Sequence, residues 1–173
     1  MDENQKGEVS MEPEKNKSKN TGFIKRCEEY DRSQIEKIVT EGIRRLEFSA
    51  EGKVFVKPNV VFAFNTNRMG HAAYTAPPLV GAALIALSRE PGIKRIDMGE
   101  KTAVGVPTRL CYKHAGYYDE VKSVRKKAGC PVKIFCMEEE KREPVFVGGK
   151  VHDVLRISKK MAKADKKVYL PKL

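Results

Sequence analysis

The chain alternates short apolar runs with segments whose apolar residues recur at helical spacing. Residues 53–57 hold three consecutive apolar residues between two lysines, the pattern of a strand that is buried on both faces of a parallel sheet. Pro58 has no N–H to donate to a strand ladder, so we predict that the strand ends there. Apolar positions three and four apart predict an amphipathic helix over residues 32–47, with Ser33 and Glu36 spaced as its capping box.

The next segments continue this alternation. Residues 79–87 carry no charge, which predicts a helix that is buried nearly all round. Thr75 is placed to cap this helix, and Pro77 and Pro78 fit its first turn. The remaining predicted elements are strands at 94–98, 132–137 and 167–170, a helical region over 107–128 that breaks near Gly116, a solvated turn over 138–143, and one or two helical turns over 158–164.

Strands that alternate with helices predict a doubly wound, largely parallel α/β sheet. We expect an added β-hairpin from residues 145–147 and 151–157, because Gly148 and Gly149 suit a two-residue turn with positive φ. Residues 1–20 are polar and charged with almost no apolar content, so we expect a disordered tail. Residues 21–173 are then a partial α/β domain.

Charge and hydropathy limit the partners. The formal net charge of the 173 residues is +11. The electrostatic field of this charge attracts phosphate-bearing partners. The start of the chain lacks the basic and apolar regions of a secretory signal, and the longest apolar stretch, residues 77–87, is too short for a membrane span. We therefore expect a cytoplasmic protein with no membrane partner.

The four cysteines are dispersed. Cys27, Cys111, Cys130 and Cys136 form no C-x-x-C pair, which argues against a zinc ribbon or a self-contained iron–sulfur motif. We expect reduced, mostly buried thiols, no metal site and no cofactor in this chain.

Several short motifs occur in a specific order. They are Val54-Phe55-Val56-Lys57-Pro58-Asn59, Thr75-Ala76-Pro77, Met98-Gly99-Glu100, a glycine at 116, Ala164-Asp165, and Leu170-Pro171-Lys172. This succession resembles the domain of unknown function 362 family from about residue 23 to the last residue. The resemblance implies an α/β domain without an assigned activity, often found with ferredoxin-like [4Fe–4S] modules.

The resemblance also implies what lies outside these residues. The cluster-binding module of the family carries a compact run of cysteines that this chain lacks, so a [4Fe–4S] cluster is expected only in a missing or partner module. The family pattern continues beyond the element that ends at Leu173. We therefore expect a domain that is truncated after this element and associates with an iron–sulfur module.

The candidate site follows from where parallel strands end. Ligands bind outside the carboxyl ends of strands in open α/β sheets, where we expect Lys57, Asn59, Glu100 and Lys172, with Thr75 at the start of a helix on the same side. Lysine beside a helix N-terminus suits a phosphate or carboxylate, because exposed N–H groups favour negative charge. In the alternative interpretation, Asn59 and Glu100 cap turns, Thr75 caps the helix and Lys57 is solvated.

No reaction follows from these residues, and whether the chain is an enzyme stays open. A single carboxylate at Glu100 is no catalytic pair. Arg68 and His71 are most simply solvated loop residues, and His114 and His152 are taken as structural. Two other classes remain: a basic nucleic-acid-binding module, suggested by the basic residues of 156–173, and a non-catalytic scaffold or fragment of a split protein.

Overall fold

The computed structural model describes residues 22–64 and 72–172, and its centre is a four-stranded parallel sheet. The strand order is β3-β2-β1-β6, and all three neighbouring pairs are parallel. The prediction of a parallel-containing α/β fold is therefore confirmed. The strands are β1 (Gly52–Pro58), β2 (Ile93–Glu100), β3 (Val132–Cys136) and β6 (Lys166–Leu170).

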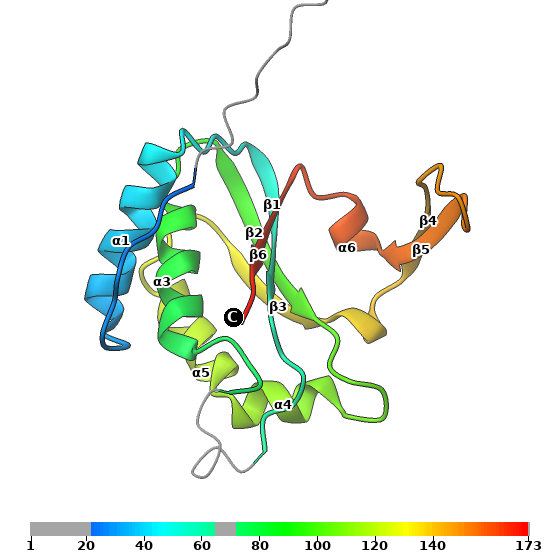
Figure 1. Ribbon diagram of the computed structural model, residues 1–173, viewed down its shortest axis with the longest axis horizontal. Helices are drawn as coiled ribbons and strands as arrows, with labels where there is room; N and C mark the ends of the chain where they lie inside the picture. The colour runs from blue at the N-terminus through cyan, green and yellow to red at the C-terminus, as the bar shows by residue number, and fades with distance from the viewer. Residues whose placement is uncertain (1–21, 65–71, 173) are drawn as a thin grey trace, which may run out of the picture.

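The two faces of the sheet are covered differently. Helices α1 (Arg32–Arg45), α3 (Pro77–Ser88) and α5 (Tyr117–Arg125) lie on one side, as Figure 1 shows. The other side carries the short helix α6 (Lys159–Ala162) and the antiparallel hairpin β4 (Arg142–Phe146) and β5 (Val154–Ser158). The chain is completed by α4 (Thr108–His114) and the 3₁₀ turn η1 (Met137–Glu139).

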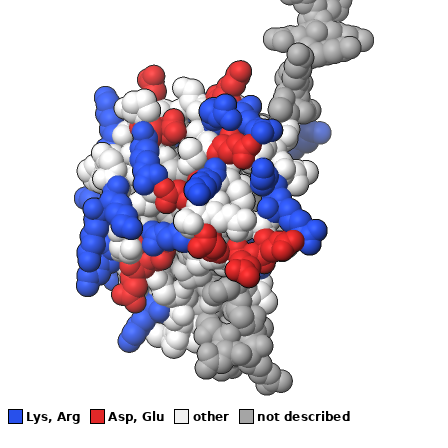
Figure 2. All heavy atoms as spheres, turned by 90° about the vertical axis from the view of Figure 1, so that its left-hand side faces the viewer, with Lys and Arg blue, Asp and Glu red and all other residues white. Residues whose placement is uncertain are grey.

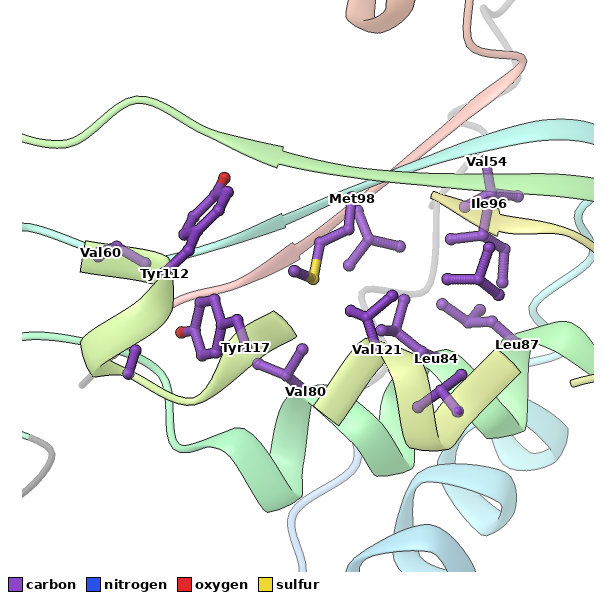
Figure 3. Close-up of a cluster of buried hydrophobic side chains, with 14 of the residues drawn as sticks. Val54, Val60, Val80, Leu84, Leu87, Ile96, Met98, Tyr112, Tyr117 and Val121 are labelled. Atoms are coloured by element: carbon purple, nitrogen blue, oxygen red, sulfur yellow. The ribbon is translucent and has the colours of Figure 1, made fainter. Parts of the chain in front are cut away.

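The core explains why the apolar runs at residues 54–56 and 79–87 form β1 and α3. Val54 and Val56 face Ile96 and Met98 in a cluster that α3 and α5 cover (Figure 3). Every residue from 80 to 88 of α3 is buried, as its lack of charge predicts. The alternate residue Phe55 points to the other face, where it is 0% exposed and its ring centre lies 6.1 Å from that of Phe135.

The strand order creates a reversal beside β1. The chain runs from β1 to β2 and β3 through α3 and α5 on one face, and returns from β3 to β6 along the other face (Figure 1). Crossovers between parallel strands are right-handed, so connections that move along the sheet in opposite directions have to cross on opposite faces of it. The carboxyl ends of β1 and β6 therefore flank the topological switch point, the place where open α/β sheets bind ligands.

An ion pair between α1 and α5 passes over Gly81 of α3. Gly81 of α3 lies under an ion pair in which Arg32 Nη2 of α1 is 3.0 Å from Glu120 Oε1 of α5. A Cβ at this glycine would lie 1.5 Å from Glu120 Oε1. Burial raises the pKa of Glu120, and Arg32 opposes that rise. The glycine therefore provides the space in which the α1–α5 ion pair forms.

Two local predictions are wrong. Asp31, not Ser33, caps α1: its carboxylate accepts from Gln34 N at 2.7 Å, while the Ser33 hydroxyl donates to the same carboxylate. Ser33 is already inside the helix, so the capping-box register is shifted. The hairpin turn is also longer than the two glycines, because Val147 N donates to Asp153 O at 2.7 Å across the connection. The expected tail over residues 1–20 lies outside the described residues.

Candidate functional site at the strand ends

The five predicted site residues lie at the carboxyl edge of the sheet, which we call the strand-end rim. Lys57 and Glu100 belong to the last two residues of β1 and β2, and Asn59 directly follows β1. Lys172 lies two residues after β6, and Thr75 lies two residues before α3. The fold thus places all five at the same edge of the parallel sheet, although their individual contacts differ from those predicted.

Lys57 and Glu100 form an ion pair across two neighbouring strands. Lys57 Nζ donates to Glu100 Oε2 at 2.5 Å, and Glu100 Oε1 accepts from the backbone N–H of Lys101 at 2.8 Å. The Glu100 side chain is 6% exposed and that of Lys57 is 31% exposed. Lys57 is therefore held by a buried carboxylate rather than solvated, while Glu100 also caps the turn that follows β2.

Thr75 joins the ends of two strands instead of capping α3. Its Oγ1 accepts from Asn59 N at 2.9 Å and donates to Leu170 O at 2.6 Å. The N-cap of α3 is Ala76, which has no side-chain cap. The helix-cap prediction for Thr75 is wrong, because the Thr75 hydroxyl is used between β1 and β6.

The start of α3 offers few donors to an anion. Pro77 and Pro78 have no N–H, and the N–H groups of Leu79 and Val80 both donate to Ala76 O. The first turn therefore has no free N–H among residues 77–80. The prediction that N–H groups of this turn bind an anion is wrong. The partial positive charge of the helix end remains, so direct contacts with a ligand would have to come from side chains.

Asn59 and Lys172 contact segments that the sequence did not link to them. Asn59 Nδ2 donates to Ala73 O at 3.4 Å, which closes the loop after β1. Lys172 Nζ donates to the hydroxyl of Tyr30 at 3.4 Å and lies 6.0 Å from the centre of its ring. Lys172 therefore brings the segment before α1 to the rim. Arg68 and His71 lie outside the described residues.

Two buried tyrosines support the rim from below, and the sequence analysis missed them. Tyr117 donates to Thr75 O at 2.7 Å, and Tyr112 donates to Phe135 O at 3.1 Å and Glu100 O at 3.3 Å. Burial raises the pKa of both phenols, so both remain protonated donors at neutral pH. The signal in the sequence was a pair of tyrosines on either side of the break at Gly116.

The four cysteines lie in different parts of the fold. Cys111 and Cys136 are buried on α4 and β3, Cys130 is half-buried, and Cys27 is exposed before α1. Burial raises the pKa of Cys136 to about 11, with Glu139 and Glu138 adding to the rise, and it also raises the pKa of Cys111 and Cys130. Cluster ligation needs thiolates, so these environments oppose it.

Anaerobic reconstitution with iron and sulfide is therefore expected to leave no stoichiometric cluster on this chain. The bound iron and sulfide, and the visible absorbance, should match those of a variant in which Cys111 and Cys136 are both serine. A stoichiometric cluster that this double substitution removes would contradict the prediction.

Residues 22–64 and 72–172 contain no group of three His, Cys, Asp or Glu side chains arranged to hold a metal ion. Within the same residues, no helix is long and apolar enough to cross a membrane. Of the five residues of the strand-end rim, Lys57 and Glu100 form an ion pair with each other.

Comparison with known proteins gives one match. A family model described as "Domain of unknown function (DUF362)" matches residues 54–173. No curated protein and no solved structure matches the chain. The matched region begins in β1 and includes the whole strand-end rim.

Proposed function

The chain belongs to the DUF362 family, and on this premise we propose that its strand-end rim binds a small molecule that carries a carboxylate or a phosphate. The family description assigns no activity, so support has to come from the geometry. The observation that carries the proposal is Lys57, an ammonium group held in place by Glu100 beside the topological switch point.

Lys57 is arranged to give hydrogen bonds to a ligand. Its ammonium group has three donors, and one of them goes to Glu100. The side chain is partly exposed, at 31%, so the remaining donors can reach an incoming anion. Because Glu100 already fixes the side chain, binding costs less conformational entropy than it would for a free lysine.

Lys172 adds a second positive charge at the same edge. It follows β6, the strand that lies beside β1 at the switch point. Two ammonium groups outnumber the single carboxylate of Glu100 at the rim, which favours an anion over a cation.

The same excess of positive charge underlies the nucleic-acid alternative. On the side of the molecule that α1 covers, Lys and Arg alternate with Asp and Glu (Figure 2). This mixed face lacks the one-signed stripe that follows a nucleic-acid backbone. Among the basic residues of 156–173, Lys159, Lys160 and Lys163 form ion pairs with Glu143 and Glu140. We therefore favour a small anion, and we propose that any [4Fe–4S] cluster that works with this domain is supplied by another module.

Substituting Lys57 with Ala is expected to weaken the binding of an anion by about 10- to 100-fold, since a charged hydrogen bond contributes about 1.5–3 kcal/mol. Calorimetry with inorganic phosphate and with a panel of small carboxylates measures the effect. The thermal unfolding of each variant shows whether Glu100, left without its partner, has altered the fold.

Two further variants sharpen this test. Lys57→Ala combined with Glu100→Gln removes the buried charge that the single substitution leaves behind, and it should bind as weakly as Lys57→Ala. Lys122→Ala, which removes an exposed lysine of α5, should bind like the unmodified chain. Negligible binding of every anion by the unmodified chain, or equal loss in the Lys122 variant, would refute a site at the rim.

A further inference from the structure

Two adjoining cavities lie between α1 and the elements packed beside it, and one of them reaches Leu170 at the end of β6. The outer cavity, of about 380 Å³, lies between the segment before α1 and the first turns of α1 and α3. The inner cavity, of about 160 Å³, lies between α1, α3 and β6. Val39 lines both cavities, so they adjoin, and we call them together the α1 groove.

The walls of the α1 groove are mainly apolar. The inner cavity is lined entirely by apolar side chains, which come from α1, α3, β6 and the segment that follows α1. In the outer cavity Ile35, Ile38 and Leu79 add to Val39. The inner lining residues are Val39, Ile43, Leu46, Phe48, Ala83, Leu87, Val168 and Leu170.

The polar residues of the groove are confined to its outer end. Lys25 lies 3.7 Å from Glu41, and Glu28 lies 3.2 Å from Arg26, so these charges already have partners. Cys27, Glu29 and Tyr30 complete this end. A ligand that follows the groove inward therefore leaves the charged residues behind and meets hydrocarbon only.

Lys172 lies close to both cavities, although it lines neither of them. It follows Leu170, which lines the inner cavity, by two residues, and it donates to the hydroxyl of Tyr30, which lines the outer cavity. Lys172 forms no ion pair within the described residues. A positive charge thus stands beside an apolar groove, which is complementary to an amphipathic anion.

We propose that the α1 groove binds the hydrocarbon chain of a fatty-acid-like ligand whose carboxylate contacts Lys172. The inference rests on the proposed function, since Lys172 belongs to the strand-end rim, and it specifies the class of anion. The outer cavity alone has a volume typical of small-molecule sites, which are mostly apolar with few polar groups. An apolar groove beside one lysine suits an amphipathic anion with a single hydrocarbon chain.

The test is the dependence of affinity on chain length. Calorimetry with acetate, octanoate and dodecanoate, below the micellar concentration of each, should show affinity that rises by about two- to fourfold per added methylene, the upper value following from full burial of a CH₂. Lys172→Met keeps the apolar stem and should weaken octanoate and dodecanoate about 10-fold each.

Two variants block the groove by different means. Ala83→Leu fills the inner cavity, and Leu46→Glu puts a carboxylate at its edge, where Leu46 is 44% exposed and a polar residue should not unfold the chain. Each should lower the affinity for dodecanoate at least 10-fold and leave phosphate binding unchanged. Val61→Glu, at a residue that is 46% exposed outside the groove, is the matched control and should bind dodecanoate normally.

The outcomes separate this inference from the proposed function. Phosphate binding that depends on Lys57, together with affinity that is independent of chain length, would overturn the groove and leave the rim. Chain-length dependence without any effect of Lys57→Ala would support the groove with Lys172 and overturn the proposed anion site at Lys57. Light scattering completes the test: if Leu46→Glu dissociates a dimer, a second copy of the chain covers the groove and the fatty-acid proposal is wrong.

Discussion

Phe55→Ala is expected to lower the free energy of unfolding by about 3–5 kcal/mol, the range for removing a buried aromatic side chain. Phe55 is 0% exposed in the central strand and packs against Phe135. Among the described elements, α6 and the hairpin lie on the side of the sheet that Phe55 faces. Few neighbouring elements can move in to fill the space that the ring leaves. The cavity should therefore contribute nearly its full amount to the loss of stability.

Chemical denaturation of the variant measures the loss. Tyr169→Ala is the matched control, since this aromatic residue of the neighbouring strand β6 is 52% exposed, and its substitution should cost less than about 1 kcal/mol. A loss below 1 kcal/mol for Phe55→Ala would mean that this side of the sheet is not part of the cooperative core.

Gly81→Ala is expected to destabilise the fold by about 1–2 kcal/mol, against the trend of helix propensity. Alanine in a helix is ordinarily more favourable than glycine by about 1 kcal/mol. Here the added methyl would lie 1.5 Å from Glu120 Oε1 and 3.0 Å from Arg32 Nη2. It would displace the carboxylate and break a partly buried ion pair, a change that leaves a charge without compensation.

The double variant Gly81→Ala with Glu120→Ala gives the decisive comparison. Truncating Glu120 removes the atoms that clash, so in that background alanine at position 81 should be neutral or stabilising. The coupling between the two substitutions is read from a double-mutant cycle of unfolding free energies. Equal costs of Gly81→Ala with and without Glu120 would show that the ion pair is not the obstacle.

The elements with unbroken apolar patterns were predictable from the sequence, and their caps and turns were not. β1 and α3 are nearly free of polar residues in their interiors, so only burial on all sides fits them. Asp31 caps α1 instead of Ser33. Both residue types can cap a helix, and they stand two positions apart, so the sequence alone did not determine at which of them the helix begins. The paired glycines marked the hairpin correctly, but they do not determine how many residues its connection holds.

The strand-end rim was likewise predictable only in part from the sequence. Parallel strands with polar residues at their ends indicated which residues would share an edge, and all five of them do. The sequence could not show which atoms would meet there. Pairing of Lys57 with Glu100 depends on β1 lying beside β2, and the bonds of Thr75 depend on β6 lying on the other side of β1. These contacts join residues that are 43 and 95 positions apart.

The strand order also determines when the sheet can be completed during synthesis on the ribosome. β1 pairs with β2 soon after both emerge, but its other neighbour is the last strand of the sheet. The first contact on that side, between Lys53 N and Asp165 Oδ2, spans 112 residues. At about 5–20 residues per second, one edge of the buried strand β1 has no partner for several seconds. Nascent chains that are stalled before β6 should therefore be the species that mispair and need chaperones.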